Sequence, residues 1–136
     1  ERELMDRELI REQTMQMIFQ MDINGSWDYE TQSVIPENAA AIDKKQAIRT
    51  LEIIRDHIED IDAIISESTD KWATGRIAKT ELAILRNAVA EMKYIDEIPN
   101  GVAINEAVNL AKKYGDERSY AFVNSVLRKV NTALEG

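Results

Sequence analysis

The chain has 136 residues, no cysteine and a formal net charge of −8. A chain of this length forms one domain with a sizeable core, and the lack of cysteine excludes disulfide bonds and thiolate metal sites. No apolar stretch is long enough to cross a bilayer and no leader segment is visible, so we expect a soluble, cytoplasmic protein.

The negative charge lies in the first half of the chain. Residues 1–70 contain seven Lys and Arg against 17 Asp and Glu, whereas residues 71–136 contain ten basic and eight acidic residues. A phosphate group senses the local potential within about 8 Å at physiological salt rather than the net charge. A basic patch on the second half is therefore compatible with the overall acidity, although charge alone favours ordinary solvated helix faces.

Apolar residues recur with helical spacing along most of the chain, and strand-like alternation does not persist. This pattern predicts an all-α fold, a compact bundle of six or seven helices. An irregular connection between Asn24 and Pro36 follows the first helix, and it is long enough to be mobile or to hold a short extra helix. In chain order, the expected helices cover residues 4–21, 43–57 (or from Asn38), 60–72, 78–95, 102–114 and 117–134.

Particular residues mark the ends and the buried side of these helices. Pro99 separates the helix that ends near residue 95 from the next one. Gly115 is expected to end a helix in the left-handed conformation, and Asp116 to cap the N-terminus of the last helix. The stripe of the first helix that is expected to be buried comprises Leu9, Ile10, Met17, Ile18 and Met21.

Catalytic patterns are mostly missing from the sequence. It contains no cysteine nucleophile and no glycine-rich loop that could cradle a phosphate. The single histidine, His57, lies among acidic residues, but a di-iron bundle motif needs a Glu three residues earlier, where Ile54 stands. We interpret this segment as a solvated helix end, and we expect neither an enzyme nor a bound metal or cofactor.

Four motifs occur in a fixed order in the second half of the chain. They read I-L-R-x-A, P-x-x-V-A-I-N-E-A, A-K-x-Y-G and F-V-N-x-V-L, and they begin at Ile84, Pro99, Ala111 and Phe122. With these motifs the chain resembles the NusB family of bacterial transcription antitermination factors. The resemblance is strong over about residues 76–131 and weaker in the first helix, and elsewhere only the helical pattern supports it.

The resemblance implies an all-α fold of two small helical subdomains, which we place at about residues 1–73 and 74–136. It also implies a non-enzymatic adaptor without a cofactor. Such an adaptor pairs with NusE, a protein of the small ribosomal subunit, and binds the boxA element of nascent RNA. Through this complex it acts indirectly on RNA polymerase, supports ribosomal RNA transcription and has no membrane partner.

Single-stranded RNA is held by basic side chains at phosphates, by amides at base edges and by aromatic stacking. The resemblance carries such roles to six residues of this chain: Arg7, Arg11, Gln16, Arg86, Lys112 and Phe122. Pattern alone favours core packing for Phe122 and surface charge for Arg86 and Lys112. Asn105 and Asn124 stay undecided between a structural role and RNA contact.

The surface that meets NusE is expected to include Phe19 and Glu81. Phe19 lies off the apolar stripe of its helix, so an outward aromatic ring is expected there. Glu81 also suits the positive end of its helix, and both roles are compatible. The same Phe19 face leaves a homodimer possible in the free protein.

Two alternatives stay open. The first is the NusB-like RNA-binding domain of an RNA cytosine methyltransferase, which requires a further domain after Gly136; because the last helix ends near Glu135 without a linker, we rank it second. The other is a helical interaction module without RNA affinity. The acidic first helix favours it, since the family's basic cluster is reduced to Arg7 and Arg11 unless basic residues precede Glu1.

Overall fold

The computed structural model describes residues 2–31, 41–70 and 74–135, with side chains over 7–30, 44–70 and 75–135. This part of the chain is all helical and contains no strand. Pro36, Asn38 and Trp72, where helix ends or a loop are predicted, lie outside it. The elements are α1 (Arg2–Asn24), η1 (Tyr29–Thr31), α2 (Ala41–Glu67), η2 (Thr74–Arg76), α3 (Lys79–Tyr94), α4 (Asn100–Tyr114) and α5 (Glu117–Glu135).

The described residues form five α-helices and two short 3-10 helices, so the predicted count of six or seven is wrong. The difference lies in α2, which runs through the segment where a helix was expected to end and another to begin. His57 interrupts the helical backbone there, with φ −129° and ψ 22°, but the helix resumes at once. The apolar pattern of the sequence changes near this residue, but such a change does not distinguish a kinked helix from two separate helices.

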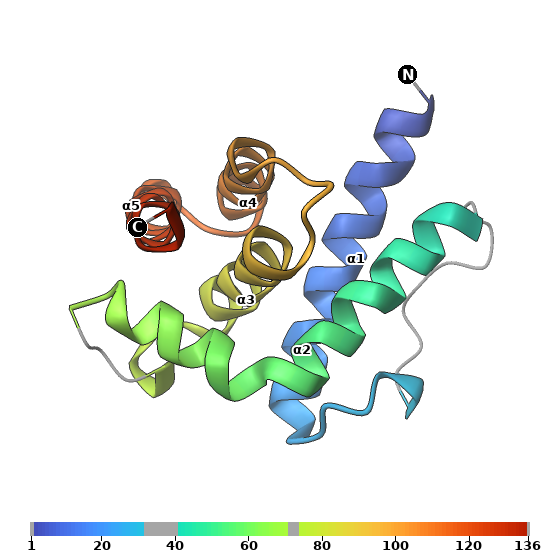
Figure 1. Cartoon of the computed structure of the whole chain (residues 1–136), viewed down its shortest axis with the longest axis horizontal. Coiled ribbons are helices and arrows are strands. Elements are labelled where there is room, and N and C mark those ends of the chain that lie inside the picture. The colour runs from blue at the N-terminus through green and yellow to red at the C-terminus, as the bar shows by residue number, and fades with distance from the viewer. Residues whose placement is uncertain (1, 32–40, 71–73, 136) are drawn as a thin grey trace.

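α3 lies at the centre of the bundle. It contacts each of the other α-helices, with α1 and α2 on one side and α4 and α5 on the other (Figure 1). Every residue from Leu82 to Met92 is buried. A helix buried on all sides normally carries apolar residues only, yet this stretch includes Arg86, Asn87 and Glu91. Each of these polar side chains therefore requires a partner inside the protein.

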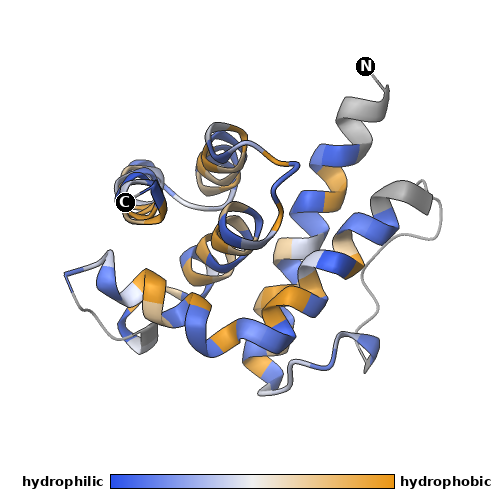
Figure 2. Ribbon diagram, in the orientation of Figure 1, coloured by the Kyte–Doolittle hydropathy of each residue, from blue (hydrophilic) through white to orange (hydrophobic). Residues whose placement is uncertain are grey.

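The apolar core surrounds α3. Apolar residues gather on the helix surfaces that face the interior, and polar residues cover the outside (Figure 2). Ile10, Met17, Ile18 and Met21 of α1 are buried, as predicted. Leu9 is 43% exposed, so its predicted burial is wrong. The α1 surface that faces the core instead includes Thr14, whose hydroxyl donates to the Ile10 carbonyl oxygen at 2.7 Å.

The turn between α4 and α5 depends on two adjacent residues. Asp116 caps α5 as predicted, because its Oδ1 accepts the backbone N–H of Ser119 at 3.0 Å. Gly115 does not adopt the predicted left-handed conformation, since its φ is −130°. Its role is steric, because a Cβ at this position would lie 2.5 Å from the Cβ and Oγ of Ser119.

The placement of α3 also bears on the predicted subdomains. Because α3 packs against helices on both sides, the two halves share it as common core. The predicted boundary near residue 73 precedes α3, and this division stays a prediction. Among the described helices, none combines the length and the apolar character that crossing a membrane requires.

Candidate nucleic-acid interface

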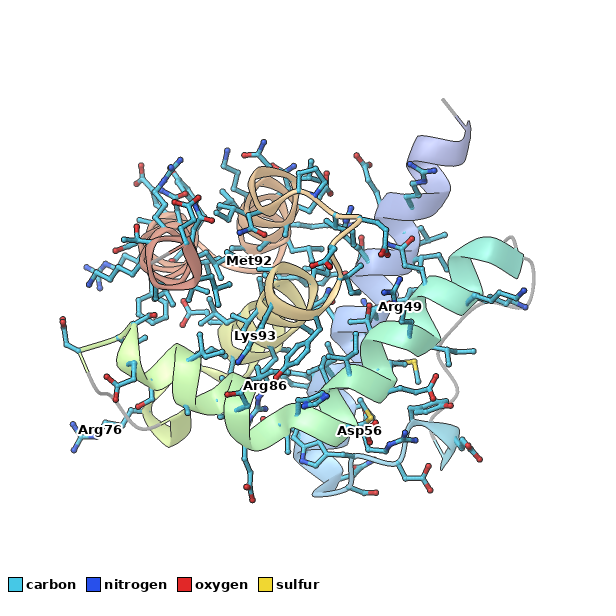
Figure 3. All side chains as sticks on the ribbon, viewed as in Figure 1. Arg49, Asp56, Arg76, Arg86, Met92 and Lys93 are labelled. Carbon is cyan, nitrogen blue, oxygen red and sulfur yellow. The ribbon has the colours of Figure 1, made fainter. Side chains whose placement is uncertain are left out.

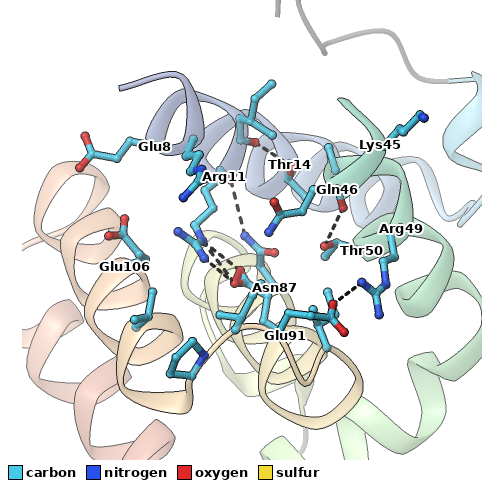
Figure 4. A pocket seen from close by; sticks show the side chains of 18 residues that line it. Glu8, Arg11, Thr14, Lys45, Gln46, Arg49, Thr50, Asn87, Glu91 and Glu106 are labelled. Atoms are coloured by element: carbon cyan, nitrogen blue, oxygen red, sulfur yellow. Dashed lines mark hydrogen bonds and ion pairs between the residues drawn. The ribbon is translucent and has the colours of Figure 1, made fainter. Parts of the chain in front are cut away.

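A cleft of about 570 Å³ opens between α1, α2 and the segment that joins α3 to α4 (Figure 4). Arg7 and Arg11 of α1 line it, together with apolar residues such as Ile10 and Val102. Arg7 is exposed, and its charge is accessible to solvent. The two arginines predicted to meet RNA phosphates therefore lie on one side of α1, as expected from their spacing of one turn.

Arg11 forms an ion pair with Glu91 of α3. Its Nε lies 3.1 Å from Glu91 Oε1, and its terminal nitrogen lies 2.9 Å from Oε2. The Arg11 side chain is 18% exposed and that of Glu91 only 4%. Burial lowers the pKa of the Arg11 guanidinium, but hydrogen bonding and charge from Glu91 outweigh burial and raise it. Arg11 thus compensates a buried carboxylate and joins α1 to α3.

Arg86 is buried between three elements, with 5% of its side chain exposed. Its Nε and one terminal nitrogen donate to the two carboxylate oxygens of Asp62 at 2.8 Å each. The other terminal nitrogen lies 3.2 Å from Asp22 Oδ2, and the guanidinium lies 5.0 Å from the centre of the Trp27 ring. Figure 3 shows Arg86 inside the bundle, whereas Arg76 projects outward. This placement favours a structural role for Arg86 over the predicted RNA contact.

Gln16 belongs to a cluster between α1 and the end of α4. Its Nε2 donates to the hydroxyl oxygen of Tyr114 at 2.9 Å, and that hydroxyl in turn donates to Glu12. Lys113 Nζ lies 2.8 Å from Glu12 Oε2. Although burial raises the pKa of the Glu12 carboxyl, hydrogen bonds from Lys113 and Tyr114 hold it below its ordinary value. The structure therefore brings Gln16 beside the basic end of α4.

The remaining RNA candidates lie on α4 and α5. Lys112 is exposed, and its Nζ lies 5.3 Å from the centre of the Tyr120 ring. Phe122 is partly buried and packs against the core, so part of its ring remains accessible. Asn105 is exposed and Asn124 is half-buried. The exposed position of Asn105 does not fit a buried structural amide.

The two residues predicted to meet NusE lie on elements that an ion pair joins. Lys79, two residues before Glu81, has its Nζ 3.2 Å from Asp22 Oδ2, and Asp22 follows Phe19 by three residues on α1. The end of α1 and the start of α3 are therefore adjacent. Phe19 is partly buried against the core, and Glu81 is half-buried in the first turn of α3.

His57 lies at the kink of α2. No group of three His, Cys, Asp or Glu side chains suited to a metal ion occurs among the described residues. The imidazole stacks on the Tyr94 ring, with 4.3 Å between ring centres. The predicted helix end at this segment is wrong, because α2 continues through His57 to Glu67.

The sequence did not reveal the residues that contact Arg11, Arg86 and Gln16. Glu91, Trp27 and Tyr114 received no role, although each contacts a residue that did. Glu91 lies 80 positions from Arg11 in the chain, and no local spacing connects the two. The one available signal was Tyr114, which belongs to the A-K-x-Y-G motif.

Comparison with known proteins places these features in a family. The model of the NusB family matches residues 8–132. Transcription antitermination protein NusB of Oceanobacillus iheyensis is 42% identical over 127 residues, which cover 93% of this chain and 98% of that protein. The protein of the same name from Bacillus mycoides is 40% identical over 137 residues, which cover 96% of this chain and 100% of that protein.

Solved structures agree with this match. T. maritima NusB superposes with a TM-score of 0.86 and 30% identity, over 93% of this chain and 90% of that one. A NusB chain from a structure of antitermination factors NusB and NusE in complex with dsRNA has a TM-score of 0.76 and 26% identity, over 94% and 97%. These relatives are named as antitermination factors and not as enzymes, in line with the expected non-catalytic chain. The chain belongs to the NusB family.

Proposed function

We propose that this protein is a transcription antitermination adaptor that pairs with NusE and binds boxA RNA in nascent transcripts. The observation that carries the proposal is the family match over residues 8–132, and relatives about 40% identical are named transcription antitermination protein NusB. A structural neighbour is described in complex with NusE and RNA. Acting on nascent transcripts, the protein works in the cytoplasm and supports ribosomal RNA transcription.

The geometry supports a division of labour among the predicted RNA contacts. Arg7 and Lys112 are exposed cations, and Phe122 offers part of an aromatic ring. Phosphate contact and base stacking need such accessible groups. Arg11 and Arg86 are already paired with carboxylates, so we assign to them the positioning of α1 and α3.

The test measures binding of boxA-type RNA and of a scrambled RNA of equal length, with and without NusE, by fluorescence anisotropy. We expect boxA-type RNA to bind more tightly than scrambled RNA, and NusE to increase the difference. Phe122→Ala is expected to weaken boxA binding while NusE binding changes little, and to lower thermal stability because the ring packs against the core. Equal affinity for both RNAs in the presence of NusE would refute the proposal.

The same experiment separates the two alternative functions. A helical module without RNA affinity predicts NusE binding and equal, weak binding of both RNAs. The two relatives described above are named transcription antitermination proteins, whereas the methyltransferase alternative requires a second domain. Intact mass of the native gene product tests it directly.

A further inference from the structure

The cluster that joins α1 to the end of α4 contains an exposed aromatic ring without an assigned role. Tyr114 is 38% exposed. Its hydroxyl accepts from Gln16 and donates to Glu12, so two residues of α1 hold the phenol end of the ring. Lys113 Nζ lies 5.8 Å from the ring centre and pairs with the same Glu12 carboxylate.

A second cluster of the same composition occurs at the end of α3. Lys93 and Tyr94 both contact the Asp60 carboxylate, and Lys93 Nζ lies 5.4 Å from the Tyr94 ring centre. In that cluster His57 covers the ring by stacking on it. The Tyr114 ring likewise has a neighbouring lysine, Lys113, and a carboxylate anchor, Glu12, but it remains accessible.

An accessible ring that is fixed at its polar end suits stacking against a nucleobase. Base stacking on tyrosine tolerates any sequence, and an adjacent lysine serves the phosphate that follows the base. The neighbouring pair of Lys112 and Tyr120 adds a second ring and cation to the same turn between α4 and α5. Since both hydroxyl partners of Tyr114 come from α1, the ring is oriented before RNA arrives.

We propose that Tyr114 stacks on a base of the bound RNA, and that Gln16 is a positioning residue that acts through the Tyr114 hydroxyl. The inference rests on the proposed function and deepens it. It names an RNA-binding residue beyond the six expected ones. It also gives Gln16, expected as a direct RNA donor, an indirect role, because its Nε2 already donates to Tyr114.

The first test compares Tyr114→Ala and Tyr114→Phe with the wild-type protein, on boxA-type RNA in the presence of NusE. Tyr114→Ala removes the ring and is expected to weaken binding about tenfold or more. Tyr114→Phe keeps the ring and loses its anchors, so we expect a smaller loss than in Tyr114→Ala. Because the ring is uncharged, the salt dependence of binding stays unchanged in both variants. Wild-type affinity in Tyr114→Ala would overturn the proposal.

A double-mutant cycle tests the role of Gln16. If Gln16 acts through the hydroxyl, Gln16→Ala weakens binding in the wild-type background and has no further effect in Tyr114→Phe. Fully additive losses would show that Gln16 contacts RNA itself and would overturn its positioning role.

The matched cluster at the end of α3 supplies the controls. Tyr94→Phe and Lys93→Ala are expected to leave RNA affinity unchanged, and thermal unfolding of Tyr114→Ala verifies that the variant is folded. A loss of RNA affinity could also arise from weaker binding to NusE, so NusE binding is measured without RNA. If Tyr114→Ala weakens NusE binding by the same factor, Tyr114 belongs to the partner surface and the proposal is overturned. If the wild-type protein does not prefer boxA-type RNA, the proposed function fails, whereas wild-type preference with an unaffected Tyr114→Ala refutes only this inference.

Discussion

The guanidinium of Arg86 compensates two carboxylates, those of Asp22 and Asp62, within a largely buried site. Removing one partner of such a pair leaves the other charge desolvated and uncompensated, which costs more than the pair itself contributes. We expect Arg86→Ala to lower the free energy of unfolding by about 3 kcal/mol, measured by urea denaturation.

Arg128→Ala is the matched control, because Arg128 is exposed on α5 and its loss should change stability by less than about 0.5 kcal/mol. If Arg86→Ala were equally harmless and weakened RNA binding instead, Arg86 would return to the RNA contacts. From the sequence pattern alone, Arg86 was interpreted as a surface charge. A single arginine in an apolar helix is assigned to the solvent-exposed face as long as its buried partners are unknown.

Glu81 is the residue at which the predicted NusE-binding surface can be tested. Charge reversal in Glu81→Lys removes a negative charge from the start of α3 and opposes the helix dipole, next to the end of α1 where Phe19 lies. We expect NusE binding to weaken about tenfold, measured by calorimetry. The control is Glu135→Lys at the far end of α5, and equal affinity in Glu81→Lys and wild type would remove Glu81 from this surface.

At the scale of elements, the turn between α4 and α5 depends on close approach. A methyl group at residue 115 would collide with Ser119, so Gly115→Ala is expected to destabilise the protein by about 1–3 kcal/mol in chemical denaturation. Gly101, in the first turn of α4, has open space where a Cβ would stand. Gly101→Ala should therefore stabilise by about 0.5 kcal/mol, and a stabilising Gly115→Ala would contradict the steric argument.

The contact between α1 and α4 predicts a dependence on pH. The pKa of Glu12 is lowered in the folded protein, so its contribution to stability is full above the ordinary glutamate value of about 4.3 and is lost as the pH falls through the lower folded-state value. The melting temperatures of wild type and Glu12→Gln should differ by a constant amount between pH 6 and 8, and should converge as the pH falls through the lowered folded-state pKa of Glu12.

Glu135→Gln provides the comparison for this element, because Glu135 is exposed at the end of α5. Its melting temperature should follow that of the wild type at every pH. A difference between wild type and Glu12→Gln that is as large at pH 3 as at pH 7 would show that the contribution of Glu12 does not depend on its charge.

At the scale of the whole molecule, the local sequence predicts the helices of the fold. It does not predict the polar contacts in the interior. Apolar spacing with Pro99 and Gly115 predicts α3, α4 and α5 to within two residues of their ends. The pairing of Arg11 with Glu91 joins residues 80 positions apart, so only the assembled bundle reveals it. The family resemblance carried RNA contacts to Arg11 and Arg86, and periodicity could not reveal that carboxylates inside the bundle already compensate both charges.

This difference between accessible and compensated cations predicts how salt affects RNA binding. A cation that meets a phosphate releases counterions, and each such contact adds about 0.7 to the slope of log affinity against log salt for single strands. Arg7 and Lys112 are exposed, so Arg7→Ala and Lys112→Ala should each lower the slope by about this amount. Arg11→Gln removes a charge that Glu91 already compensates, and the slope should stay at its wild-type value even where affinity falls. The measurement is a salt titration of boxA-type RNA binding with NusE present. If Arg11→Gln lowered the slope as much as Lys112→Ala, the guanidinium of Arg11 would leave Glu91 and bind a phosphate in the complex.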